Sequence, residues 1–302
     1  MSNSLRIPEP TSHFHGTPAP TPVELAVIVP MYREAKRIGP TLRDLVATLP
    51  RFASSWEIIL VDDGSPDDTL GVVGEVSQSL SELSVAGVLP IRIVRHPRNR
   101  GKGAAVRTGL AHAHAAWSLV MDADNACSVQ EVGPLLALAR SSPNVGLVSG
   151  SRRVQGANVK AVAQRQLAGA IFRGVLHTLG LALLSDTQCG FKLYRGDLSR
   201  HIARQGVVDG YAFDLEHLLL TKRAGLQIAE LGVRWDHQEG GQVSPIRDGL
   251  KMTISATRLR LRWLFRPPAM PDLSRVALVK EMIEVKPAEV VAPGPGQVSR
   301  SR

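Results

Sequence analysis

The sequence predicts an α/β fold in which helices cover both faces of a mostly parallel central sheet. One sign is a series of five short apolar runs, rich in β-branched residues, each too short to form a helix. A second sign is the polar turn and longer helical segment that follow each run, an alternation typical of parallel sheets. Composition agrees, because 302 residues with 44% hydrophobic and 21% charged side chains are ordinary for a globular protein.

The five apolar runs are the expected strands, and in chain order they are Leu25–Val29, Ile58–Val61, Ile91–Val94, Ser118–Met121 and Val145–Val148. The expected helices follow them at residues 36–49, 67–80, 102–116, 129–140 and 160–184. We expect one domain at residues 23–245 and then a basic amphipathic helix at 246–268. Residues 1–22 and 269–302 are rich in Pro, Gly and Ser or lack the regular spacing of apolar residues that helices and strands show. We expect both segments to be flexible tails.

Several classes of protein are disfavoured. Two cysteines, Cys127 and Cys189, are too few for a disulfide scaffold or a Cys-based zinc cluster, and they suit a reducing compartment. Residues 1–22 contain no apolar stretch of the kind that signal peptides carry. No uncharged apolar run reaches the ~20 residues that cross a bilayer. We therefore expect a cytoplasmic protein that neither is secreted nor spans a membrane.

The net charge of +9 is concentrated in two segments. Residues 92–107 carry +6 and residues 245–268 carry +5, so the rest of the chain carries −2. Such concentration favours anionic partners, namely phosphates, nucleic acid or an anionic membrane surface. Nucleic acid is the weakest of these partners, because aromatic side chains that could stack on bases make up only 4% of the chain. We therefore expect no nucleic-acid partner.

Polar clusters follow all five expected strands, at the edge of a parallel sheet where ligands bind. These clusters are Pro30–Glu34, Asp62–Ser65, Asn99–Gly103, Asp122–Asp124 and Ser149–Arg152. Because the carboxyl ends of parallel strands meet at one edge, the five clusters predict a single site.

Asp122 and Asp124 are the candidate metal ligands. Side chains alternate along an extended chain, so the two carboxylates lie on the same side. Such a pair can hold a hard divalent cation whose remaining positions are filled by water and substrate phosphate oxygens. A turn or a helix N-cap is the alternative for an isolated pair. The position after an apolar strand favours the metal.

Two other clusters suit a nucleotide. Asp62 and Asp63 are available to accept hydrogen bonds from a base N–H and from ribose hydroxyls. Their turn lacks the Gly-x-Gly-x-x-Gly pattern, which disfavours an NAD or FAD enzyme. Asn99–Gly103 brings backbone amides and cations to the start of a helix, a suitable place for phosphate, although a solvated basic turn is the alternative.

In this order the motifs resemble the inverting family 2 glycosyltransferases, which have the GT-A fold. The resemblance covers about residues 24–265 and includes Val29–Glu34, Val61–Ser65, Asn99–Gly103, Asp122–Asp124, Phe213–Glu216 and Lys222–Gly225. Within that family, Gly150–Arg152 and Asp186–Lys192 are similar to the polyprenyl-phosphate branch, and most of all to dolichyl-phosphate β-glucosyltransferases.

The resemblance implies transfer of a hexose, with glucose from UDP-glucose as our expected donor, to a polyprenyl phosphate. The donor site that it implies is made of Pro30, Tyr32, Glu34, Asp62, Asp63, Lys102 and Asp122. It further implies that Asp122 and Asp124 hold Mg²⁺ or Mn²⁺, and that Arg152 and Arg165 receive the acceptor phosphate. Asp214 lies where the family has its general base, so the implied catalytic residues are Asp214, Lys102 and Arg152.

The chemistry of the reaction agrees with these roles. A divalent cation and Lys102 would stabilise the negative charge that grows on the departing nucleoside diphosphate. A phosphate monoester has a second pKa of ~6 and is mostly a dianion at neutral pH, so it needs a strong base less than a hydroxyl does. We therefore expect Asp214 to position groups as much as to take protons. Glu216 is either an orienting partner or exposed helix surface.

The second basic segment predicts a helix at a membrane surface. Helical spacing places Arg247, Lys251, Arg258 and Arg262 on one ridge beside apolar residues, with Trp263 near the end. This pattern favours an interfacial helix over an ordinary solvated one, and hence a peripheral enzyme on the cytoplasmic face of a membrane.

Two rival activities remain. The same fold can transfer a sugar to a saccharide or glycolipid hydroxyl. A sugar nucleotidyltransferase is less favoured, because it typically has a Gly-rich loop after the first strand and Pro30–Arg33 contains no glycine.

Overall fold

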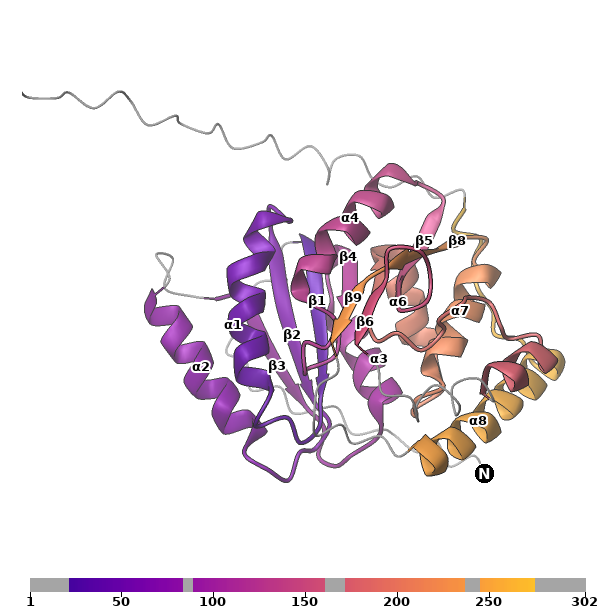
Figure 1. Cartoon of the computed structure of the whole chain (residues 1–302), viewed down its shortest axis with the longest axis horizontal. Coiled ribbons are helices and arrows are strands. Elements are labelled where there is room, and N and C mark those ends of the chain that lie inside the picture. Colours follow the sequence, from indigo (N-terminus) through magenta and orange to yellow (C-terminus); the bar gives the residue numbers. More distant parts are fainter. Residues whose placement is uncertain (1–21, 84–88, 161–171, 237–244, 275–302) are drawn as a thin grey trace, which may run out of the picture.

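The computed structural model describes residues 22–83, 89–160, 172–236 and 245–274 (Figure 1). Within these residues, seven strands form one sheet in the order β3-β2-β1-β4-β7-β5-β8. The strands are β1 (Val23–Met31), β2 (Trp56–Asp62), β3 (Ile91–Arg95), β4 (Ala115–Val120), β5 (Val145–Ser151), β7 (Lys192–Arg195) and β8 (Gln227–Gly232). All neighbours are parallel except β7, which runs antiparallel to β4 and β5. Two short strands, β6 (Asn158–Lys160) and β9 (Arg234–Asp236), pair separately.

Helices cover both faces of the sheet, as the sequence predicts. Leu25, Val27 and Val29 of β1 face one hydrophobic cluster and Ala26 and Ile28 face the other, because alternate side chains of a strand point to opposite faces. The first cluster includes side chains of α1 (Ile38–Thr48), α2 (Thr69–Leu83) and α4 (Val132–Ser141). The second includes side chains of α3 (Lys102–His112), α6 (Gly196–Gln205) and α7 (Phe213–Arg223).

All five expected strands are present, but two expected helices have the wrong bounds. The helix expected at 102–116 ends at His112, since Ala115 and Ala116 already belong to β4. Of the helix expected at 160–184, Lys160 lies in β6 and residues 161–171 lie outside the described part of the chain. Residues 172–178 are helical, and the helix stops at Gly180, whose φ of 66° and two backbone bonds form a Schellman cap.

The last described helix is α8 (Pro245–Phe265), which packs Ala256 and Leu259 against Leu176 and Leu215. Trp263, near the end of α8, packs partly buried against the protein core. None of the described helices is both long enough and apolar enough to span a bilayer.

The expected C-terminal tail begins too early. Leu273 is buried, its amide donates to the Ala224 carbonyl, and its own carbonyl accepts from Arg195 Nη2. Residues 270–273 therefore still belong to the packed body. Residues 1–21 of the expected N-terminal tail and residues 275–302 of the expected C-terminal tail fall outside the described residues.

Candidate active site

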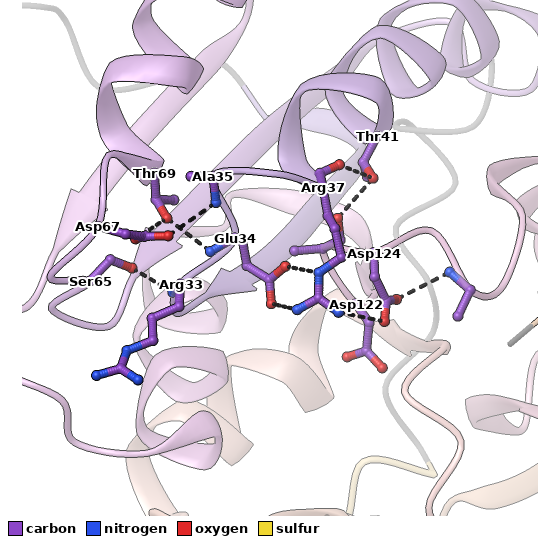
Figure 2. Close-up of polar contacts among 12 residues, drawn as sticks. Arg33, Glu34, Ala35, Arg37, Thr41, Ser65, Asp67, Thr69, Asp122 and Asp124 are labelled. Carbon is purple, nitrogen blue, oxygen red and sulfur yellow. Dashed lines mark hydrogen bonds and ion pairs between the residues drawn. The ribbon is translucent and has the colours of Figure 1, made fainter. Parts of the chain in front are cut away.

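The loop that follows β1 is tied to the loop that follows β2 (Figure 2). The Arg33 amide donates to Ser65 Oγ at 3.0 Å, and the Glu34 amide donates to Thr69 Oγ1 at 2.9 Å. Arg33 has a left-handed φ of 59°, and its guanidinium lies 5.3 Å from the centre of the Tyr32 ring. Pro30, the last but one residue of β1, is half-buried. These contacts hold Pro30, Tyr32 and Glu34 at the carboxyl edge of the sheet.

Arg37 is a site residue that the sequence analysis missed. Its guanidinium donates two hydrogen bonds of 2.7 Å to the Glu34 carboxylate, and its Nη1 lies 3.7 Å from Asp124 Oδ2 (Figure 2). Burial raises the pKa of Glu34 to about 7, with Arg37 opposing and the negative charges of Asp124 and Asp122 adding to the rise. Arg37 thus connects the loop after β1 to the candidate metal ligand Asp124.

Asp62 and Asp63 lie at the end of β2 and are both buried. Asp62 Oδ1 accepts from the Ser65 amide at 3.1 Å. Its Oδ2 is 3.2 Å from Arg95 Nε but has no hydrogen-bond partner within the described chain. Asp62 therefore keeps one oxygen that could accept a hydrogen bond.

Asp63 is not available in the way we expected. Its Oδ2 accepts from the Gly101 amide at 2.8 Å, and its Oδ1 accepts from the Arg100 amide at 2.9 Å. The same Oδ1 lies 2.7 Å from His96 Nδ1, whose Nε2 lies 2.9 Å from Thr108 Oγ1. Asp63 therefore fixes the loop after β3, and both of its oxygens are already used within the chain.

The backbone at the start of α3 is likewise occupied. The Gly103 and Ala104 amides both donate to the Asp209 carbonyl, at 2.8 and 3.3 Å. Three amides of the expected phosphate cluster, those of Arg100, Gly101 and Gly103, therefore already have acceptors within the chain, and the Lys102 side chain is the group that this loop extends towards an anion. Glu216 holds the opposing segment, since its Oε2 accepts from the Val207 and Val208 amides at 2.9 Å. This buried bonding rules out exposed helix surface for Glu216, and the group that its carboxylate orients is the backbone of residues 207–208.

Lys102 and Asp122 form the centre of the site. Lys102 Nζ, from the first residue of α3, lies 2.5 Å from Asp122 Oδ1, just beyond the end of β4. Burial acts to lower the pKa of Lys102, but the Asp122 and Asp214 carboxylates outweigh it and hold that pKa above its usual range. Burial acts to raise the pKa of Asp122, but Lys102, Lys192 and Arg152 lower it. At neutral pH the pair is therefore an ammonium beside a carboxylate.

The negative charge of Asp124 is compensated less fully than that of Asp122, because its nearest cation, Arg37, lies 3.7 Å away. Its Oδ1 accepts from the Ala126 amide at 3.1 Å, while burial and the neighbouring Asp122 raise its pKa. Among the described residues no group of three or more His, Cys, Asp or Glu side chains is arranged to hold a metal ion. Two carboxylates therefore fit a hard divalent cation only if water and substrate phosphate oxygens supply its other ligands.

Arg152, one residue beyond β5, is held by Asp186. Its Nε and Nη2 donate to the two carboxylate oxygens at 2.7 and 2.8 Å, and its amide donates at 3.0 Å. The guanidinium carbon lies 5.6 Å from the centre of the Trp235 ring. Arg152 is thus oriented on one edge by a carboxylate and on one face by an aromatic ring. Arg165, its expected partner, lies outside the described residues.

Asp214 lies in the first turn of α7 and is 5% exposed. Its Oδ1 accepts from Lys192 Nζ at 2.7 Å, a buried ion pair that the sequence analysis missed. Burial raises the pKa of Asp214, with Lys192 and Lys102 opposing that rise. Lys102, Asp122 and Asp214 therefore form one electrostatically coupled group.

Comparison with known proteins identifies the family. Residues 26–202 match the sequence model of Glycosyl transferase family 2. The chain is 31% identical to the dolichyl-phosphate beta-glucosyltransferase of Saccharomyces cerevisiae, in an alignment that covers 80% of this chain and 75% of the yeast protein. It is also 31% identical to the enzyme of the same name from Homo sapiens, over 80% of this chain and 76% of the human protein. The enzyme of the same name from Drosophila melanogaster is 32% identical over 80% of this chain and 76% of its own.

Solved structures agree on the fold. Mannosyl-3-phosphoglycerate synthase from Rubrobacter xylanophilus superposes with a TM-score of 0.60 at 20% identity, covering 85% of this chain and 80% of that one. Glucosyl-3-phosphoglycerate synthase from Mycobacterium tuberculosis, solved in complex with Mn²⁺ and UDP-glucose, gives 0.57 at 17% identity, covering 79% of each chain. These neighbours are GT-A glycosyltransferases, so the mostly parallel sheet found here has the expected GT-A architecture. With more than half of its length matched by the family model, this chain belongs to glycosyl transferase family 2 and is a glycosyltransferase.

Proposed function

We propose that this glycosyltransferase moves glucose from UDP-glucose to a polyprenyl phosphate, with inversion at the anomeric carbon and with Mg²⁺ or Mn²⁺ as cofactor. The observation that carries the proposal is the ion pair of Lys102 and Asp122 beside Asp124, at the edge where the strands end. Support for the acceptor comes from the relatives, which are named dolichyl-phosphate beta-glucosyltransferases. Support for the donor and metal comes from the neighbour in complex with Mn²⁺ and UDP-glucose.

On the donor side, Lys102 supplies a permanent positive charge to the diphosphate. Its raised pKa keeps the ammonium protonated across the physiological range, so it stabilises the negative charge that develops as the sugar leaves. A divalent cation held by Asp122 and Asp124 would neutralise part of the same charge. Asp62 Oδ2, buried and without a hydrogen-bond partner in the described chain, suits an N–H donor of the nucleoside.

On the acceptor side, Arg152 receives the lipid phosphate with the part of its guanidinium that Asp186 leaves unused. The phosphate is mostly a dianion at neutral pH, because its second pKa is ~6, and it can attack without losing a proton first. Asp214, buried and paired with Lys192, then orients the reacting groups more than it removes a proton.

We extend the proposal to peripheral attachment at the cytoplasmic face of a membrane through α8. Five large apolar side chains of this helix are exposed: Leu250, Ile254, Leu261, Leu264 and Phe265. At 100° per residue they form one stripe, roughly opposite the buried Ala256 and Leu259. The exposed Lys251, Arg258 and Arg262 flank the stripe, and each basic residue contributes about 1 kcal/mol near anionic lipid. Two buried free cysteines suit a reducing compartment.

The acceptor is tested with radiolabelled UDP-glucose and Mn²⁺, offered with either a polyprenyl phosphate or a panel of saccharides. We expect label in the organic phase with the lipid. Label in the saccharide fraction alone would replace the proposal with transfer to a hydroxyl. Release of pyrophosphate from glucose 1-phosphate and a nucleoside triphosphate would indicate a nucleotidyltransferase.

Membrane attachment is tested by flotation with vesicles that contain 1-palmitoyl-2-oleoyl phosphatidylcholine alone or mixed with phosphatidylglycerol. We expect co-flotation with the anionic vesicles and its loss in a Leu261→Ser/Leu264→Ser/Phe265→Ser variant. Unchanged flotation of that variant would show that α8 is not the contact. As a matched control, Ile93→Ser changes an exposed apolar residue on the edge strand β3 and should float normally.

A further inference from the structure

Lys192 occupies an unusual place because β7 runs against its neighbours. The parallel strands present their last residues to the functional edge, whereas the antiparallel β7 presents its first residue, Lys192. Lys192 pairs with Val120 on β4 and with Ser149 on β5. It therefore lies between the strand ends that carry Asp122 and Arg152.

The Lys192 ammonium uses all three of its protons within the protein. Nζ donates to Asp214 Oδ1 at 2.7 Å, to the Cys189 carbonyl at 2.5 Å and to the Thr187 carbonyl at 3.2 Å. The residue is 1% exposed. An ammonium has three donors and no acceptor, so none remains for a substrate. Lys192 can act on the reaction only through the groups that it holds.

The two carbonyls belong to a loop that packs on the centre of the site. Thr187 and Cys189 precede Gly190, and a Cβ at Gly190 would overlap the Asp122 carboxylate. Holding these carbonyls therefore sets how close the loop lies to Asp122. Lys192 therefore bonds directly to Asp214 and, through the 187–190 loop, holds the backbone that packs on Asp122.

We propose that Lys192 is a positioning residue that keeps Asp214 ionised and oriented and holds the 187–190 loop against Asp122. The inference rests on the proposed function only in taking Asp214 as part of the transfer machinery. The charged groups that act electrostatically on Asp214 are Lys192 from β7, Lys102 from α3 and Asp122 just after β4, and Asp214 in turn acts on Tyr194 of β7. Lys192 is the cation in direct contact among them, so its removal leaves a buried carboxylate without its bonded partner.

The ionisation of Asp214 is measured without any assay of activity. In protein labelled with ¹³C at Asp Cγ, the Asp214 signal is the one missing from Asp214→Asn. We expect it to titrate about one pH unit or more higher in Lys192→Met than in the wild type. The matched control is Lys222→Met, which removes an exposed lysine of α7 and should leave the signal unchanged. An unchanged titration in Lys192→Met would overturn the proposal.

Kinetics supply the second measurement. We expect Lys192→Met to lower kcat about tenfold or more. The double variant Lys192→Met/Asp214→Asn should lose less activity than the product of the two single losses, because both changes break the same ion pair. Losses that multiply would mean that Lys192 acts independently of Asp214, against the proposal.

Misfolding of the variant and failure of the proposed acceptor must each be distinguished from failure of the proposal for Lys192. Should circular dichroism show that Lys192→Met does not fold, Lys192→Gln, which is also neutral but retains a donor for the carbonyls, carries the same two measurements. Wild-type protein that is inactive towards polyprenyl phosphate would count against the proposed acceptor, and the Asp214 titration would still decide the role of Lys192.

Discussion

The α-carbon of Gly190 lies against the carboxylate of Asp122, so closely that a Cβ at position 190 would overlap both carboxylate oxygens. Close packing on an acid is thus the reason for a glycine here. Asp122 in turn is paired with Lys102, so a change at position 190 reaches Lys102, the residue that we propose for the diphosphate, through one intervening side chain.

Gly190→Ala should therefore weaken binding of the donor. The added methyl group must displace the Asp122 carboxylate or the loop, and we expect the affinity for UDP in the presence of Mn²⁺ to fall about tenfold, as measured by calorimetry. Gly74→Ala is the control, because Gly74 is exposed in α2 with no atom within 4 Å of an added Cβ. It should stabilise the fold by about 0.5–1 kcal/mol and leave binding unchanged. Wild-type affinity in Gly190→Ala would contradict this account.

Asp63→Ala should destabilise the fold and loosen the loop after β3. The Arg100 and Gly101 amides would lose their acceptor, which costs about 1–3 kcal/mol in the free energy of unfolding measured with urea. The KM for the donor should rise as well, because this loop leads into Lys102. Glu75→Ala, on the exposed side of α2, provides a control in which neither quantity should change. A stable variant with normal KM would argue that Asp63 does not position the loop.

Asp124→Asn should strongly reduce the turnover that depends on the metal. The amide removes one of two carboxylates, and we expect kcat/KM at saturating Mn²⁺ to fall about a hundredfold, because a metal contributes several kcal/mol of transition-state stabilisation. The circular dichroism spectrum should not change. Removal of metal from the wild type by a chelator should give a similar loss. Near-normal activity of Asp124→Asn with Mn²⁺ would place the metal elsewhere.

Glu34→Gln should alter how stability depends on pH. The pKa of Glu34 is raised from 4.5 to about 7, with burial as the largest cause, so the folded protein binds this proton more tightly than the unfolded chain does. The stabilisation is fully present below pH 4.5 and is lost as the pH rises through about 7.

Between those two pH values, metal-free wild type should therefore lose up to about 3 kcal/mol of unfolding free energy relative to Glu34→Gln. Urea denaturation at several pH values in a chelator measures the difference. Parallel curves for the two proteins would show that Glu34 keeps an ordinary pKa.

Much of the sheet could be predicted because its strands are buried on both faces. The apolar runs in β1 and β2 are continuous, and the rule that parallel strands end at one edge correctly predicted that Lys102 and Asp122 lie together. The same rule did not predict that Lys192 lies at this edge. It begins a strand of four residues, and an antiparallel strand brings its start, not its end, to that edge.

The internal bonding of the site could not be predicted from residue types. Asp63 was expected to face a nucleoside, but its acceptors are filled by amides whose positions depend on the path of the 96–101 backbone. Two glycines with left-handed φ, Gly64 at 70° and Gly101 at 106°, allow that path. Arg37 was missed for a similar reason, since its contact with Asp124 joins segments far apart in the sequence.

The reversed direction of β7 has an evolutionary consequence. The polypeptide departs from the sheet at Ser151 and re-enters it at Lys192, and both points lie on the catalytic side. Of the described residues between them, the strand β6 pairs with β9 and not with the seven-stranded sheet, so this segment does not fix the order of the sheet. Grafting it from a relative with a different acceptor, while Asp186–Gly190 is kept so that the contacts with Arg152 and Asp122 remain, offers a route to a different acceptor specificity.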